Sequence, residues 1–433
     1  MNRPAGDTIF ALSSGSLPAA LGVIRVTGPK AAAALQAIAG RVPEPRRAAL
    51  SILRHPDSGE VLDYALILFF AGPRTETGED LAEFHIHGGR AIASAMLAAL
   101  ATIDGLRPAE AGEFTRRSFE NGKLDLTAVE GLADLVQAET ESQRRAAVAL
   151  AGGALRRRID GWEKSLLALS ASLEAALDFS DEGDVGEELP GTWSDELAAL
   201  QAELGAALAQ PPRERLRDGI RVVIAGPPNS GKSTLLNALA GRDAAITSPI
   251  PGTTRDVVEA PTAIGGTPFL LIDTAGLRDS EDPIESIGIA RAEANVGDAD
   301  ILLWMGDPGA CRQRDRAICV QSRADLLAPE ARDQQADLHV SPVSGEGMDA
   351  LVTLLLERAG QLLPREGELA LNARHRALLG ECAARLGEAG AEADLLIKAE
   401  ALRQARLQLD RITGRAGVED MLDVLFGSLC IGK

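Results

Sequence analysis

One segment restricts the fold of this 433-residue chain more than any other: residues 226–233 read Gly-Pro-Pro-Asn-Ser-Gly-Lys-Ser. They match the GxxxxGK[ST] pattern in full, and they lie between the apolar run Ile220–Ala225 and a helix-forming run that begins at Thr234. A strand, a glycine-rich loop and a helix in this order form a P-loop, in which backbone N–H groups and the helix N-terminus face phosphates. The motif predicts that Lys232 contacts the β- and γ-phosphates and that Ser233 binds Mg²⁺.

Two later segments complete the pattern of a GTPase of the translation-factor-like class. Thr254, in Gly-Thr-Thr-Arg-Asp, can supply the second Mg²⁺ hydroxyl, and the apolar run 269–272 ends in Asp273 followed by Thr-Ala-Gly. Release of both loops after hydrolysis would act as an order–disorder switch. The residues expected to contact GTP, including those that the resemblance given below adds, are Asn229, Ser230, Gly231, Lys232, Ser233, Thr234, Ser248, Thr253, Thr254, Asp273, Thr274, Ala275, Gly276, Ser322, Asp325 and Ser341.

The sequence departs from the usual GTPase pattern in three places. Leu277 stands where Ras-like enzymes have the glutamine that orients water, so either hydrolysis is slow or another group serves. The base-recognition segment reads Ser322-Arg-Ala-Asp325 where Asn-Lys-x-Asp is usual, so the asparagine contact to guanine is lost. Pro342 has no N–H to offer the guanine O6. The last two changes predict reduced GTP affinity and reduced base discrimination.

Composition and charge exclude several other functions. The net charge is −19, and Phe, Trp and Tyr number 9, 3 and 1. Such a chain lacks the excess of basic residues and the aromatic rings that a large non-specific nucleic-acid-binding surface needs. The four cysteines form no Cys-x-x-Cys pair, and no run of 18 apolar residues occurs. We therefore expect reduced thiols, no membrane span and a cytoplasmic protein.

The pattern of apolar and polar residues changes along the chain and predicts a multidomain protein. Mixed β-like and helical runs indicate an α+β N-terminal domain over residues 1–121, and long helix-forming runs follow over 122–216. Apolar strands alternate with helices over 217–366, which predicts an inserted α/β domain with a parallel sheet. Residues 367–433 are mostly helical again and would form the second half of a discontinuous helical domain. The strands expected in the α/β part are 220–225, 269–272, 301–305, 318–321 and 338–340.

Several short motifs outside the P-loop region identify a family. They are Thr77-Gly-Glu-Asp80, His87-Gly-Gly89, Gly112-Glu-Phe-Thr115, Asn121-Gly-Lys-Leu-Asp-Leu126 and the terminal Cys430-Ile-Gly-Lys433. With them the chain resembles the MnmE (TrmE) family of tRNA-modification GTPases over essentially its whole length. The resemblance implies a folate-binding N-terminal domain that also forms a homodimer, and GTP hydrolysis that potassium stimulates and that drives a conformational change. It further implies a flavoprotein partner, MnmG (GidA), with which family members add a carboxymethylaminomethyl-type group to C5 of the wobble uridine of certain tRNAs.

The resemblance also assigns roles to individual residues and names the cofactors. Glu285 would orient the attacking water, and would fill the position that Leu277 leaves without a polar group. The potassium site would comprise Asn229, Ser248, Ile250 and Thr253, beside a Mg²⁺ site at Ser233 and Thr254. The one-carbon source would be 5-formyl-tetrahydrofolate or a related derivative, held by Arg25, Glu83, Lys123 and Lys433.

Some alternatives stay open on the sequence. Cys430 is either a catalytic or redox thiol near Lys433 or a small residue packed in the folate pocket. The arginine clusters 144–145 and 156–158 either contact tRNA, which we expect to be held largely through the partner, or form a solvated helical face. A ribosome-assembly GTPase and a folate-dependent one-carbon transferase regulated by GTP are the competing functions.

Overall fold

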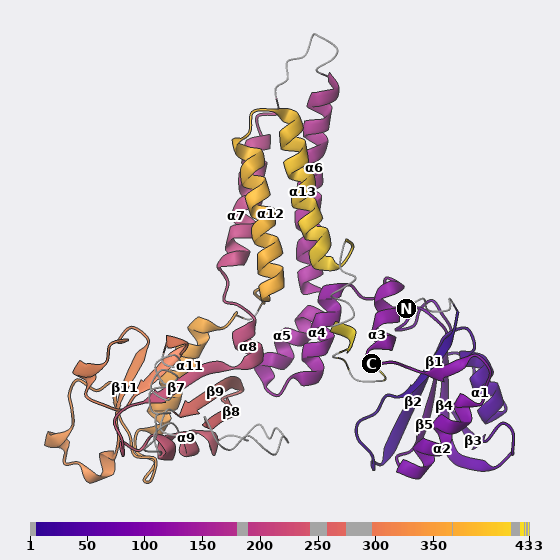
Figure 1. Ribbon diagram of the computed structural model, residues 1–433, viewed down its shortest axis with the longest axis horizontal. Coiled ribbons are helices and arrows are strands. Elements are labelled where there is room, and N and C mark those ends of the chain that lie inside the picture. Colours follow the sequence, from indigo (N-terminus) through magenta and orange to yellow (C-terminus); the bar gives the residue numbers. More distant parts are fainter. Residues whose placement is uncertain are drawn as a thin grey trace, which may run out of the picture. The chain divides into compact units, whose positions relative to one another are not determined.

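The computed structural model describes residues 6–179, 189–242, 258–273, 297–365, 367–416, 425–427, 429 and 432. The chain divides into two compact units (Figure 1). The first unit combines residues 1–133 with 413–433, and the second comprises residues 134–412. The first unit therefore joins the two ends of the chain, and the second contains the P-loop segment.

A six-stranded sheet with the order β3-β4-β5-β2-β1-β6 forms the centre of the first unit. The pairing is antiparallel except between β1 and β6. Burial alternates along β4, because successive side chains of a strand point to opposite faces and only one face is covered. The strands are β1 (Thr8–Leu12), β2 (Leu21–Thr27), β3 (Ala49–Arg54), β4 (Val61–Phe70), β5 (Leu81–His87) and β6 (Leu106–Pro108).

Helices α1 (Ala31–Ala39) and α2 (Arg90–Ala101) cover one face of this sheet (Figure 1). Their buried faces contain many alanines, which let the helices pack closely on the larger side chains of the strands, among them Ile67 and Phe84. The strand positions that point away from this core remain exposed. The large apolar side chains exposed on β3 and β4 are Leu50, Ile52, Val61, Tyr64 and Leu66.

A second, smaller core of the first unit forms around α3 (Glu113–Glu120) and the start of α4 (Leu126–Gln137). Phe119 and Phe426 contact each other there with their ring centroids 6.2 Å apart. Gly112 caps α3 with φ 65°, and a Cβ atom at this position would lie 2.3 Å from the carbonyl oxygen of Phe426. Only glycine fits, so the motif Gly-Glu-Phe-Thr is explained in part by this close approach.

Long helices from two distant parts of the sequence share one core in the second unit (Figure 1). Buried apolar residues recur along α6 at three- and four-residue spacing, from Leu155 through Trp162 to Leu173. Helix α6 packs on α7, and α7 packs on α12. This packing confirms the predicted discontinuous helical domain. No helix in the described part of the chain is long and apolar enough to cross a bilayer. The helices are α5 (Glu141–Ala151), α6 (Ala154–Phe179), α7 (Trp193–Ala209), α12 (Ala373–Ala391) and α13 (Leu395–Thr413).

The α/β part of the second unit contains a second six-stranded sheet, with the order β12-β11-β10-β7-β9-β8. All neighbours in it are parallel except β8 and β9. The strands are β7 (Ile220–Ala225), β8 (Val258–Ile264), β9 (Thr267–Asp273), β10 (Ile301–Trp304), β11 (Ala317–Gln321) and β12 (Leu338–His339). The helices are α8 (Glu214–Asp218), α9 (Lys232–Ala240) and α11 (Met348–Leu362), with short 3-10 turns at Pro308–Ala310, Ala324–Leu326 and Pro329–Ala331.

The five strands expected here from the sequence are all present, but β8 was not expected. It lies at the sheet edge and runs antiparallel to β9, so the expectation of a purely parallel sheet is wrong at this edge. Helix α5 contacts the turn between these two strands. The backbone N–H and the hydroxyl of Ser142 both donate to the carbonyl oxygen of Gly266, at 3.2 and 2.9 Å.

Candidate functional site

The P-loop lies between the end of β7 and the start of α9, as the sequence predicts. Gly226 begins it with φ 154°, and a Cβ atom there would lie 2.9 Å from the carbonyl carbon and oxygen of Met305. Gly231 has φ 94° and precedes the first residue of α9. Both glycines adopt conformations that other residues rarely reach, and the first also permits close contact with the end of β10. The loop geometry therefore depends on these two positions.

Lys232 is the first residue of α9, its side chain reaches back to this loop, and it is only 6% exposed. Its Nζ donates to the carbonyl oxygens of Gly226 and Pro227, at 3.1 and 2.9 Å. Among the described residues no hydrogen-bond partner exists for the buried hydroxyl oxygen of Ser230. A buried hydroxyl without a partner is costly, and a bound ligand can remove that cost. The loop thus presents a lysine ammonium group and an unsatisfied hydroxyl together.

Ser233 and Asp273 meet at the start of α9 and the end of β9. The Ser233 hydroxyl donates to Oδ2 of Asp273 at 2.5 Å, and Asp273 is 3% exposed. A hydroxyl and a carboxylate oxygen are ligands that suit Mg²⁺, which binds oxygen atoms and usually keeps several waters. Ser233 and Asp273 therefore fit a magnesium site, while Thr254, the second predicted ligand, lies outside the described residues.

The base-recognition segment is connected directly to the P-loop. The Ser322 hydroxyl donates to the carbonyl oxygen of Ser230 at 2.7 Å, and the Arg323 guanidinium donates to that of Asn229 at 3.0 Å. Asn229 and Arg323 both have left-handed backbones, with φ 61° and 58°. Ser322 thus directs its only hydroxyl hydrogen at the P-loop, where it is not available to a guanine ring.

Two further residues belong to the predicted guanine pocket. Asp325 lies in the 3-10 turn after Arg323, and its side chain is exposed. Ser341 is buried, and its N–H donates to the carbonyl oxygen of Glu346 at 2.8 Å. The Ser341 N–H is therefore used within its own loop, and Pro342 has no N–H, so neither Ser341 nor Pro342 donates to guanine O6 through its backbone. Asp325 is therefore the residue that we expect to read the base.

The remaining predicted nucleotide and metal residues divide into two groups. Thr234 lies in α9 and is exposed. The other residues lie outside the described residues: Ser248, Ile250, Thr253, Thr254, Thr274, Ala275, Gly276 and Glu285, together with Cys430 and Lys433 of the C-terminal motif.

Three residues predicted to bind folate are described in the first unit. Arg25 on β2 and Glu83 on β5 are direct cross-strand neighbours, and Arg25 Nε donates to Glu83 Oε1 at 3.2 Å. The same guanidinium forms an ion pair of 2.9 Å with Glu76 in the loop between β4 and β5. Lys123 follows α3 and lies close to Gly78 of that loop, where a Cβ atom would be 3.1 Å from the lysine Cε. The β4–β5 loop thus contacts both Arg25 and Lys123.

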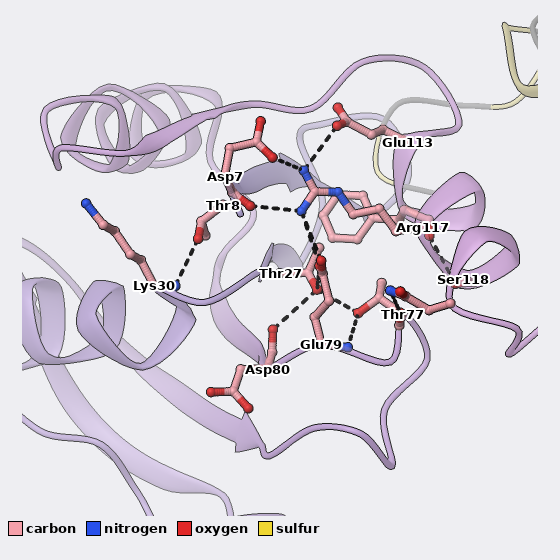
Figure 2. Close-up of polar contacts among 12 residues, drawn as sticks. Asp7, Thr8, Thr27, Lys30, Thr77, Glu79, Asp80, Glu113, Arg117 and Ser118 are labelled. Carbon is pink, nitrogen blue, oxygen red and sulfur yellow. Dashed lines mark hydrogen bonds and ion pairs between the residues drawn. The ribbon is translucent and has the colours of Figure 1, made fainter. Parts of the chain in front are cut away.

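A buried ionic cluster beside this loop was not predicted from the sequence. Figure 2 shows the Arg117 guanidinium between Asp7, Glu79 and Glu113, and Arg107 adds two further bonds to Glu113. Burial raises the pKa of Glu113, but hydrogen bonds and the charges of the arginines outweigh it and hold the pKa at about 2, below the ordinary 4.5. Arg117 therefore joins the segments 77–80 and 112–115 in space, because it contacts Glu79 of the first and Glu113 of the second.

The low pKa of Glu113 predicts a loss of stability in acid. A carboxyl group with a depressed pKa in the folded state stabilises that state above its unfolded pKa and loses this effect as the pH falls through the folded value. The window here runs from about pH 4.5 down to about pH 2. We expect Glu113→Gln to cost about 3 kcal/mol at pH 7 and close to nothing near pH 2.

Hydrogen exchange of the α3 amides at several pH values would measure this difference. The exposed Glu60 offers a control, since Glu60→Gln should leave the pH profile of the first unit unchanged. A constant difference between Glu113→Gln and the unsubstituted chain from pH 7 to pH 2 would contradict the prediction.

Comparisons with known proteins agree with this arrangement. The family model described as "MnmE helical domain" matches residues 126–430, and the one described as "GTP-binding protein TrmE N-terminus" matches residues 8–123. The protein named "tRNA modification GTPase MnmE" in Rhizorhabdus wittichii is 56% identical over 99% of this chain and 97% of its own length. Proteins of the same name in Erythrobacter litoralis and Novosphingobium aromaticivorans are 55% and 52% identical, each over 99% of this chain and 100% of their own length.

Proposed function

Because the chain belongs to the MnmE family of tRNA modification GTPases, we propose that it acts with the flavoprotein MnmG on the wobble uridine of certain tRNAs. The product carries a carboxymethylaminomethyl-type group at C5 of that base. GTP hydrolysis drives the conformational change that this reaction needs. The hydrogen bond between Ser233 and Asp273 is the main support for the GTPase activity. It brings the start of α9 and the end of β9 together, as a site for phosphate and magnesium requires.

The residues of the second unit hold the nucleotide and its ions. Lys232 contacts the β- and γ-phosphates, and Ser233 and Thr254 bind Mg²⁺, which would neutralise phosphate charge when bound. Potassium would be held by Asn229, Ser248, Ile250 and Thr253, and a cation bound there would stabilise the charge that develops on the phosphates. The left-handed backbone of Asn229, held by Arg323, supports this role because it fixes the loop beside the phosphates. Glu285 orients the attacking water.

The first unit binds the one-carbon donor, 5-formyl-tetrahydrofolate or a related derivative. Arg25, Glu83 and Lys123 contact it, together with Lys433. The proximity of the first three around the β4–β5 loop supports this assignment. Cys430 of the same C-terminal motif is a candidate for a catalytic thiol.

The partner supplies most of the contacts to tRNA. Four of the five arginines in the clusters 144–145 and 156–158 are already paired with carboxylates, and Arg157 donates to the carbonyl oxygen of Gly152. These contacts support a limited role of the clusters in binding tRNA. The pairs are Arg144 and Arg145 with Glu141, Arg156 with Asp160, and Arg158 with Glu203. The acidic net charge of −19 supports it further. The reaction takes place in the cytoplasm, where tRNA and reduced folates are available.

The protein forms a homodimer through the exposed face of the first sheet. Leu50, Tyr64 and Leu66 are 67%, 59% and 44% exposed on neighbouring strands, and Leu50 and Leu66 are direct cross-strand neighbours. Contiguous apolar side chains on a sheet face are a common feature of protein interfaces. A second copy of the chain would bury them.

Leu66→Asp is expected to dissociate this dimer, because a carboxylate buried opposite an apolar face has no partner there. Light scattering after gel filtration should give the mass of one chain for this variant and of two chains for the unsubstituted protein. Leu167, 55% exposed on α6, provides a matched control in Leu167→Asp, which should remain dimeric. A dimeric Leu66→Asp protein would contradict the assignment of this face.

Reconstitution tests the function as a whole. The full chain, MnmG, tRNA, the folate and GTP are combined, and the modified uridine is measured by mass spectrometry of tRNA digests. We expect product only when all components are present and GTP can be hydrolysed. Equal product with a non-hydrolysable GTP analogue would favour the alternative of a one-carbon transferase that GTP merely regulates.

A further inference from the structure

The loop between β4 and β5, residues 71–80, contacts each side of the proposed folate site. Glu76 pairs with the Arg25 guanidinium at 2.9 Å, and that guanidinium also contacts Glu83. Gly78 has φ 81° and lies against Lys123 and Asn121, so a Cβ atom there would be 3.1 and 3.0 Å from them. A displacement of this loop would therefore move Arg25 and Lys123 at the same time.

Buried hydrogen bonds fix the second half of this loop. The hydroxyls of Thr27 and Thr77 lie 2.6 Å apart, and the Asn121 amide donates to the carbonyl oxygen of Thr77 at 2.7 Å. The Thr27 hydroxyl also contacts Glu79 Oε2 at 3.2 Å. Figure 2 shows Thr27, Thr77 and Glu79 in one network that includes the Arg117 guanidinium. Glu79 is the link between the loop and that guanidinium, with its Oε2 3.2 Å from an Arg117 nitrogen.

Arg117 connects the loop to parts of the domain that are distant in sequence. It is 7% exposed, and its guanidinium donates to the backbone oxygen and the carboxylate of Asp7, at 3.0 and 2.6 Å, and to Glu113 at 3.2 Å. A planar guanidinium can satisfy several carboxylates in fixed directions, which an ammonium group cannot. Arg107 contacts Asp7 and Glu113 of the same cluster through its own side chain.

We propose that Arg117 is a positioning residue for the folate site: it holds the β4–β5 loop through Glu79 and thereby orients Arg25 and Lys123 toward the ligand. The inference rests on the folate binding put forward above. Arg117 itself does not contact the ligand. Side chains that bind a ligand need such a supporting shell, because a small displacement of the contacts lowers affinity.

Arg107 provides the matched control, because both arginines stabilise the cluster. The experiment compares Arg117→Lys and Arg107→Lys in the full chain. Calorimetry gives the dissociation constant for 5-formyl-tetrahydrofolate, thermal unfolding gives stability, and GTP affinity reports on the second unit. We expect both variants to lose stability and keep GTP affinity, but Arg117→Lys alone to bind the folate about tenfold more weakly.

Glu79→Gln tests the same ion pair from the other partner. The Glu79 side chain is 28% exposed, so a neutral side chain can replace it there. This variant should weaken folate binding in the same direction and add little to Arg117→Lys when the two are combined, since both break one link. Equal folate affinities of Arg117→Lys and Arg107→Lys, or an unchanged affinity of Glu79→Gln, would overturn the positioning role alone. Absence of folate binding by the unsubstituted chain would overturn the proposed ligand and this inference with it.

Discussion

Replacement of Lys232 with alanine is expected to lower GTP turnover by about 100- to 1,000-fold. Its ammonium group lies inside the P-loop, within 3.1 Å of the carbonyl oxygens of Gly226 and Pro227. Charge develops on the transferred phosphoryl group in the transition state, and a preorganised cation beside it stabilises that charge more than the ground state. Alanine at this position removes the cation and leaves the loop carbonyls without their donor.

Multiple-turnover phosphate release with saturating GTP measures this effect. Lys164→Ala, on the exposed side of α6, is the control and should retain full turnover. GTP affinity and the temperature of thermal unfolding show whether Lys232→Ala loses the catalytic step alone or also nucleotide binding or folding. Turnover by Lys232→Ala within a few fold of the unsubstituted chain would contradict the assignment of the P-loop as the hydrolytic site.

A triple substitution that restores the usual base contacts is expected to raise GTP affinity by about tenfold or more. Ser322→Asn supplies an amide that can bond both the P-loop carbonyl and the base, and Pro342→Ala supplies an N–H for guanine O6. Arg323→Lys completes the usual motif and retains a donor for the carbonyl oxygen of Asn229, which Arg323 contacts at 3.0 Å. Selectivity for GTP over ATP and XTP should rise together with affinity.

Competition of these nucleotides against a fluorescent GTP analogue checks this prediction. Arg323→Lys alone is the control and should change affinity little, because it restores neither base contact. If the triple substitution does not raise the selectivity for GTP above that of the unsubstituted chain, residues other than 322, 323 and 342 read the base.

The fold class and the family could be predicted from the sequence because their signals are local. The P-loop motif and the strands around it are contiguous in sequence, and the comparisons and the fold confirm the multidomain GTPase that they predict. Strand β8 was missed because Pro261 and Glu259 interrupt its apolar pattern. Proline is tolerated on edge strands, where one side of the backbone needs no sheet partner, and β8 is such an edge.

The ionic cluster could not be predicted because its members are far apart in the sequence. Arg117 and Asp7 are separated by 110 residues, and Arg117 and Glu79 by 38. Each of these residues read alone as an ordinary surface charge, which is the usual place of arginine and glutamate. The same holds for the contact of Arg323 with the P-loop, which joins residues 94 positions apart. The acidic residues within the two family motifs were the signal that could have indicated the cluster.

GTP turnover by the purified chain in potassium chloride against sodium chloride at equal ionic strength tests the proposed potassium site. The proposal is that a cation beside the P-loop, held by Asn229 and the segment before Thr254, takes part in hydrolysis. We predict turnover at least about tenfold higher in potassium, because a potassium ion at the proposed site would stabilise the charge that develops on the phosphates. Equal, slow turnover in both salts would contradict the claim.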